Sequence, residues 1–197
     1  KFIDAKSDLS VQVHPDDDYA KKHENSYGKT EAWYILDCDE GAQLIYGFNK
    51  EITREEFRKS IEDNTFLDYV NKVNVKKGDV FFINAGTLHA IGGGILLAEV
   101  QQNCNTTYRV YDYGRLVNGK PRELHIEKAL DVANLYGMAE PKQPLRVLKY
   151  RQGAASELLS RCKYFEVYRM IVNTERRQIV HYQSDEMSFR VLLCVNG

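Results

Sequence analysis

Residues 78–89 read Gly-Asp-Val-Phe-Phe-Ile-Asn-Ala-Gly-Thr-Leu-His, a short apolar run set between glycines and closed by a histidine. Gly78 follows a lysine and turns the chain, and Val80 to Ile83 has the length and composition of a buried strand. Gly86 lies just before His89, where backbone can approach closely. The stretch therefore predicts a turn, a buried strand, a second turn and a histidine at the start of the next strand.

Similar short strands are predicted on both sides of this stretch, each aromatic or β-branched and each bounded by turn residues. The predicted strands are 11–14, 32–36, 43–48, 73–75, 80–83, 88–91, 95–100, 106–111, 165–172, 177–182 and 187–195. We expect residues 39–41 to form a hairpin turn. Gly92 to Gly94 predicts a flexible hairpin rather than a phosphate cradle, because no helix follows it. Many short strands at close spacing predict a mainly β protein built as a barrel or a sandwich.

Three segments change to helical spacing. Asp16 to Asp18 suits the acidic first turn of a short helix through His23, although a divalent cation site is an alternative use for these carboxylates. Residues 53–56 read Thr-Arg-Glu-Glu, a capping box that opens one or two amphipathic helices over 53 to about 71. A further helix is predicted over 126–135.

The composition excludes several classes of protein. The 197 residues carry 27 basic and 28 acidic side chains, for a net charge of −1, which lacks the positive surplus that nucleic-acid binding draws on. The longest apolar run is five residues, far short of the roughly 20 that span a bilayer. Four cysteines are spread singly, which indicates reduced thiols of a cytoplasmic protein rather than a disulfide framework: Cys38, Cys104, Cys162 and Cys194.

A candidate metal site can be assembled from three of the predicted strands. Alternation along a strand puts Gln12 and His14 on one face, about 7 Å apart. His89 opens another strand, and Glu31 immediately precedes a third, with Lys29 two residues before it. Two imidazoles, a carboxylate and an amide oxygen match the ligands of Zn²⁺ or Fe²⁺. The remaining histidines are assigned to surface or capping roles: His23, His125 and His181.

Two charged residues lie inside predicted strands. Arg109 falls within residues 106–111, and Glu99 falls within residues 95–100. If both point into a barrel, each is a buried charge that needs a partner. The alternative is a salt bridge on an edge strand.

Residues 78–89 also resemble the second cupin motif, with Asn84 where that motif has proline, although the first cupin motif with its His-x-His is absent. A closer resemblance is to the type I mannose-6-phosphate isomerase family, and it runs from Lys1 to about Leu135. It rests on segments that occur in the family's order: 9–17, 28–34, 86–90, 99–103 and 107–112. The resemblance implies a cupin, a jelly-roll-like β-barrel, with a small helical insertion and the start of a second, incomplete β domain.

The resemblance also implies the residues of the site. It implies one Zn²⁺ per chain, held by Gln12, His14, Glu31 and His89. It gives catalytic roles to Arg109, Glu99 and Lys29, and contacts to the substrate to Lys1 and Lys29. We expect the arginine to stabilise an enediolate, and Glu99 or a metal-linked water to transfer the proton.

The activity implied is zinc-dependent interconversion of mannose 6-phosphate and fructose 6-phosphate in the cytoplasm, with no nucleic-acid or membrane partner. A metal-dependent cupin oxygenase is one alternative, because the same ligands suit Fe²⁺. A non-catalytic cupin that binds a sugar phosphate is another. Family members are longer, so we expect a fragment, which leaves open whether this chain turns over substrate. Residues 1–140 would be the metal-binding cupin domain, and 141–197 a linker and a truncated second cupin-like domain.

Overall fold

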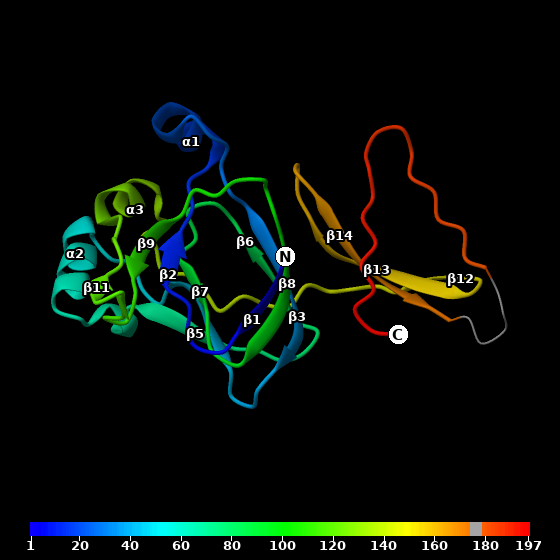
Figure 1. Ribbon diagram of the computed structural model, residues 1–197, viewed down its shortest axis with the longest axis horizontal. Helices are drawn as coiled ribbons and strands as arrows, with labels where there is room; N and C mark the ends of the chain where they lie inside the picture. Colours follow the sequence, from blue (N-terminus) through cyan, green and yellow to red (C-terminus); the bar gives the residue numbers. More distant parts are fainter. Residues whose placement is uncertain (174–178) are drawn as a thin grey trace.

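Two antiparallel sheets form the larger part of the molecule, on the left in Figure 1. The computed structural model describes residues 1–173 and 179–197. The first sheet has the strand order β1 (Phe2–Ala5), β8 (Ile95–Gln101), β3 (Glu31–Cys38) and β6 (Val80–Ile83). The second sheet has the order β5 (Val70–Asn74), β4 (Gln43–Phe48), β7 (His89–Ile91), β2 (Val11–Val13) and β9 (Tyr108–Tyr111). These two sheets, called the barrel below, confirm the predicted mainly β, cupin-like fold.

The two sheets meet through one buried apolar cluster. Side chains alternate across each strand, so every second residue of β3 and β8 turns inward. The first sheet contributes Trp33, Ile35, Phe81 and Leu97, and the second contributes Leu44, Tyr46, Val73 and Ile91. This cluster fills the space between the sheets and holds them at a fixed separation.

Short helices cover the outer side of the second sheet and extend from its end (Figure 1). They are α1 (Asp17–Glu24), α2 (Arg54–Glu62), the 3₁₀ helix η1 (Phe66–Asp68) and α3 (Ile126–Val132). The predicted capping box is present, since Thr53 and Glu56 each accept from the other's backbone N–H. Phe57 and Leu130 pack with Phe48 of β4 in a second buried cluster. The helical prediction over 53–71 is confirmed in position, but strand β5 already begins at Val70.

Both predicted hairpins are wrong. Residues 39–41 join β3 to β4, and Gly92 to Gly94 joins β7 to β8, so each turn connects strands of different sheets. A turn rich in glycine or acidic residues shows that the chain reverses, but it does not show which strands pair. At the second turn the backbones come very close, because a Cβ on Gly92 would lie 1.9 Å from the carbonyl oxygen of Gln43.

A third, separate sheet lies on the right in Figure 1. It contains β12 (Lys149–Arg151), β13 (Ala154–Arg161) and β14 (Glu166–Val172). Arg146, which precedes β12, links this sheet to the barrel, because its guanidinium donates to the Gly78 carbonyl at 3.0 Å and lies 3.7 Å from Glu157 of β13. A domain boundary at residue 140 stays a prediction.

Some strand predictions fail in this part of the chain. Residues 187–195 form no strand, because no neighbouring strand pairs with them and their apolar side chains are exposed. The prediction over 177–182 falls partly outside the described residues, and 179–182 form no strand. Several strands were not predicted from the sequence: β1, β12, β13 and a two-stranded ribbon of β10 (Leu116–Val117) and β11 (Lys120–Pro121).

All four cysteines are free thiols, as predicted. Within residues 1–173 and 179–197, no helix has the length and apolar character needed to cross a membrane.

Candidate metal centre

The predicted metal ligands meet where three strands begin or end inside the barrel. Glu31 is the first residue of β3, His89 is the first residue of β7, and His14 directly follows β2. In the second sheet Gln12 lies opposite His89 on one side and opposite Arg109 on the other. Opposite residues of antiparallel strands share a face. The second sheet therefore places these side chains in one row, on the face that points toward the first sheet.

Two imidazoles and one carboxylate converge at this point. His14 Nε2 lies 3.4 Å from Glu31 Oε1, and His89 Nε2 lies 3.7 Å from Glu31 Oε2. The two rings are 4.8 Å apart between centroids. All three side chains are buried, and their nearest ligand atoms lie within 4.8 Å of one another. This group could therefore hold a metal ion.

Backbone carbonyls fix the orientation of both rings. His14 Nδ1 donates to the carbonyl oxygen of Thr106 at 3.0 Å, and His89 Nδ1 donates to that of Thr87 at 2.8 Å. A carbonyl only accepts, so each proton sits on Nδ1 and each Nε2 presents its lone pair to the centre. Within the described residues neither of two buried atoms, His14 Nε2 and Glu31 Oε1, forms a hydrogen bond, and the contact of Glu31 Oε1 with Lys29 Nζ at 3.0 Å is an ion pair. Buried polar atoms of this kind need a partner, and a metal ion fits the donor set.

The electrostatics of the site favour the deprotonated ligands that a metal needs. Burial, reinforced by the nearby His14, lowers the pKa of His89 to about 4. Burial likewise lowers the pKa of His14. Burial alone would raise the pKa of Glu31, but its contacts with the two imidazoles and the ammonium of Lys29 hold that pKa well below its usual range. The centre is therefore two neutral imidazoles and an ionised carboxylate.

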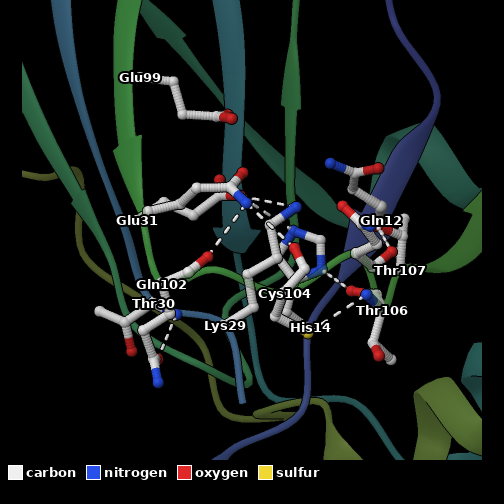
Figure 2. Close-up of polar contacts among 12 residues, drawn as sticks. Gln12, His14, Lys29, Thr30, Glu31, Glu99, Gln102, Cys104, Thr106 and Thr107 are labelled. Carbon is white, nitrogen blue, oxygen red and sulfur yellow. Dashed lines mark hydrogen bonds and ion pairs between the residues drawn. The ribbon is translucent and has the colours of Figure 1, made fainter. Parts of the chain in front are cut away.

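Gln12 and Lys29 complete the immediate surroundings, as Figure 2 shows. Gln12 Nε2 lies 3.4 Å from His89 Nε2, and the oxygen and nitrogen of an amide can exchange places by rotation. Lys29 is buried, and its Nζ lies 3.0 Å from Glu31 Oε1. The structure thus brings the fourth predicted ligand and the predicted lysine to the edge of the same centre.

Glu99 points inward, on the same side of the first sheet as Glu31 (Figure 2). It is buried, and its Oε1 lies 3.3 Å from Lys1 Nζ. Lys1 also donates to Gln101 Oε1 at 2.7 Å, so this residue is anchored to β8. Because β8 lies between β1 and β3, the alternative of an edge-strand salt bridge fails for Glu99.

Arg109 lies on β9, which is an edge strand of the second sheet. Its guanidinium donates to Ser10 Oγ at 3.3 Å and to the Glu123 carbonyl at 3.0 Å. Within the described part of the chain it forms no ion pair, so the edge-strand salt bridge fails here too. Its place in the row beside Gln12 keeps it on the site's face of the sheet.

Two residues that contact the candidate site residues were not identified from the sequence. His125, assigned a surface or capping role, precedes α3, but its Nδ1 accepts from the Arg109 backbone N–H at 3.2 Å. Trp33 donates its indole N–H to Glu31 and Glu99. Strand alternation could have signalled the contact of Trp33 with Glu31, two residues away in β3, whereas the contacts Trp33–Glu99 and Arg109–His125 depend on segments that only the fold brings together.

Two carboxylates of the acidic run after the first predicted strand form structural hydrogen bonds. Asp16 caps α1 by accepting from the Tyr19 backbone N–H at 2.8 Å. Asp17 accepts from the Gly28 backbone N–H at 3.0 Å and from the Gln102 amide at 3.1 Å. These bonds hold the segment that leads into Lys29 and Glu31.

Comparisons with known proteins agree with this geometry, although no model of a protein family matches the chain. It is 46% identical over 172 residues to a mannose-6-phosphate isomerase of Bacillus subtilis, which covers 85% of this chain and 53% of the relative. It is 42% identical over 170 residues to the mannose-6-phosphate isomerase of Streptococcus mutans, covering 86% and 52%. Among solved structures, the mannose 6-phosphate isomerase from Bacillus subtilis superposes with a TM-score of 0.80 at 39% identity, covering 87% of this chain and 55% of that one. The chain spans about half the length of the curated relatives it matches, and over that half it is related in sequence and fold to mannose-6-phosphate isomerases, as the sequence predicted.

Proposed function

We propose that the chain carries the active-site barrel of a zinc-dependent aldose–ketose isomerase that interconverts mannose 6-phosphate and fructose 6-phosphate. The observation that supports this most strongly is the buried group of His14, Glu31 and His89, with both Nε2 lone pairs turned to one point. The names of the relatives agree with it. The four free thiols fit a cytoplasmic location.

Zinc is the metal we assign to this group, with Gln12 as a fourth ligand. Histidine nitrogen and carboxylate oxygen are ordinary zinc ligands. When bound, zinc supplies a Lewis acid for the sugar oxygens without redox chemistry of its own.

The remaining residues would transfer the proton between the sugar carbons and stabilise the negative charge that develops in the reaction. Isomerisation removes a proton from C2 of the aldose and returns one to C1, so the same carboxylate can accept and then donate it. Glu99 is the candidate for this step, because it is buried and its Oε1 lies 3.3 Å from the Lys1 ammonium. Arg109 is the candidate for stabilising the enediolate, whose negative charge develops only in the reaction. Lys1 and Lys29 are the candidates for contacts to the substrate, whose phosphate is a dianion.

The test is a coupled assay of mannose 6-phosphate conversion with the purified, zinc-loaded chain, comparing Arg109→Ala with a matched control. Loss of a donor that stabilises developing charge lowers kcat by about 10²–10³-fold, and we expect an effect of this size with zinc affinity unchanged. Arg161→Ala is the control, since this arginine lies on β13 and pairs with Glu166 in its own sheet. It should leave kcat unchanged.

Three results would contradict the proposal. Full activity of Arg109→Ala would remove the role of this arginine. Binding of mannose 6-phosphate without conversion would indicate a sugar-phosphate-binding protein. Oxygen uptake by an iron-loaded chain that does not isomerise the sugar would indicate an oxygenase.

A further inference from the structure

Trp33 lies between two carboxylates of the candidate site, and the proposed reaction does not use its side chain. It follows Glu31 by two residues in β3, so both side chains point to the same face of the strand. In the register of the first sheet, Trp33 lies directly opposite Glu99 of β8. Strand pairing therefore places the indole beside both acids.

The two acids share the single N–H of the indole. Nε1 lies 3.1 Å from Glu31 Oε2 and 3.2 Å from Glu99 Oε2, and the Trp33 side chain is only 1% exposed. A buried indole N–H needs an acceptor, and hydrogen bonds to ionised acceptors are stronger than neutral ones. One donor thus joins two negative groups that would otherwise repel each other.

Both carboxylates are oriented in the same way. Each turns Oε2 toward Trp33 and Oε1 toward a lysine. Glu31 Oε1 lies 3.0 Å from Lys29 Nζ, and Glu99 Oε1 lies 3.3 Å from Lys1 Nζ. The shared N–H therefore occupies one oxygen of each acid and leaves the other oxygen to face a cation.

We propose that Trp33 is a positioning residue, which holds Glu31 oriented for the metal and Glu99 oriented for proton transfer. This inference rests on the proposed function, because both acids take their roles from it. The ring adds a second restraint, since it meets the His89 ring edge-on, with centroids 5.4 Å apart and an interplanar angle of 74°. A carboxylate and an imidazole of the metal group are thus both held by one side chain.

The test exploits the fact that Trp33 is the only tryptophan in the sequence. Expression in a tryptophan auxotroph can replace it with β-(3-benzothienyl)alanine, which keeps the two fused rings but has sulfur in place of N–H. The matched control is 5-fluorotryptophan, which keeps the N–H. We expect the benzothienyl chain to bind zinc about tenfold more weakly than the control, measured by competition with a chelator, because loss of a partner that orients a ligand has effects of that order.

A second readout concerns Glu99. In the coupled assay, the benzothienyl chain at saturating zinc should show a lower kcat with KM unchanged, because the misplaced acid affects proton transfer rather than binding. Trp33→Phe also lacks the N–H and should lose at least as much zinc affinity as the benzothienyl chain.

The outcomes separate this inference from the proposed function. Equal zinc affinities in the two labelled chains would overturn the role of the N–H. A control chain that binds no zinc would overturn the inference together with the metal site. A control chain that binds zinc more tightly than the benzothienyl chain, but does not isomerise mannose 6-phosphate, would overturn the proposed function and support the positioning of Glu31.

Discussion

The barrel and the segment from residue 149 onward contain similar apolar strand patterns, but the patterns have different outcomes. In the barrel, Trp33 and Phe57 are 1% and 0% exposed, because a strand or helix covers each face. In the last segment, residues 179–197, Met187 and Phe189 are 91% and 83% exposed, and residues 187–195 form no strand. An apolar alternation therefore predicts a strand only where other strands are present to pair with it.

The same contrast applies to polar groups. The barrel buries His14, Glu31 and His89 around one point and fixes both rings through backbone carbonyls. In the third sheet, Arg161 and Glu166 form an ion pair at 2.6 Å on the exposed surface. Buried ionisable groups need dedicated partners, whereas exposed ion pairs contribute little to stability. The third sheet also buries a carboxylate, Glu157, but pairs it with Arg169 at 2.7 Å, whereas the barrel gathers three buried groups that could hold a metal ion.

The largest difference in stability between the two regions should appear when one aromatic side chain is removed from each in turn. Phe57 packs against Phe48 and Phe66 with centroids 5.8 Å and 5.7 Å away, so Phe57→Ala should lower the free energy of unfolding by about 3–5 kcal/mol. Phe189→Ala is the matched control and should change it by about 0.5 kcal/mol or less. Urea denaturation measures both. Equal losses would show that the two regions are packed alike.

Acidification should destabilise the metal-free barrel. The folded chain keeps His89 neutral down to a pKa of about 4, whereas in the unfolded chain this imidazole takes up a proton below its ordinary value of 6.5. The unfolded state thus binds more protons, so the free energy of unfolding falls by up to about 1.4 kcal/mol per pH unit as the pH drops from 6.5 to 4. The lowered pKa of His14 acts in the same direction.

Urea midpoints measured from pH 7 to pH 4.5 in a chelator give this slope. His89→Gln should flatten it, whereas His181→Ala, in the exposed last segment, should leave it unchanged. A slope that is the same in all three chains would disconnect acid sensitivity from the site.

The smallest effect concerns the contact between the two regions. The Tyr164 hydroxyl donates to Asp17 Oδ2 at 2.6 Å, which holds the pKa of Asp17 well below its usual range. Tyr164→Phe removes this donor at a partly exposed position. We expect the free energy that stabilises the contact between the two regions to fall by about 1 kcal/mol or less. This loss should appear as faster amide hydrogen exchange in β13 of Tyr164→Phe than in the unchanged protein. Tyr168→Phe is the control, because its hydroxyl bonds to Glu166 within the third sheet. Equal exchange in both variants would show that the contact does not join the regions.

The sequence predicted most of what depends on local pattern. The turn after Lys77, the strand Val80–Ile83 and the histidine after Gly86 are all found in the structure, because glycine placement and apolar runs act locally. The placement of His14, Glu31 and His89 in the predicted strands already proposed them as a candidate metal set, and the resemblance to a family then implied the same residues as zinc ligands.

The missed features depend on pairing between distant residues. The wrong hairpins at 39–41 and at Gly92 to Gly94 arose because a turn does not specify which sheet receives the next strand. The shared N–H of Trp33 depends on β3 lying against β8 in one register. Such contacts follow from the tertiary fold rather than from any short stretch of sequence.

We propose that His14, Glu31 and His89 hold one zinc ion in the barrel. Isothermal titration of the metal-free chain with Zn²⁺ tests it directly, with His89→Ala and His181→Ala titrated in parallel. We expect one zinc site per chain in the unchanged protein and in His181→Ala. In His89→Ala we expect zinc affinity to fall by at least about 100-fold, since a ligand matters more than the partners that orient it. Equally tight zinc binding by His89→Ala would show that these three residues do not form the zinc site.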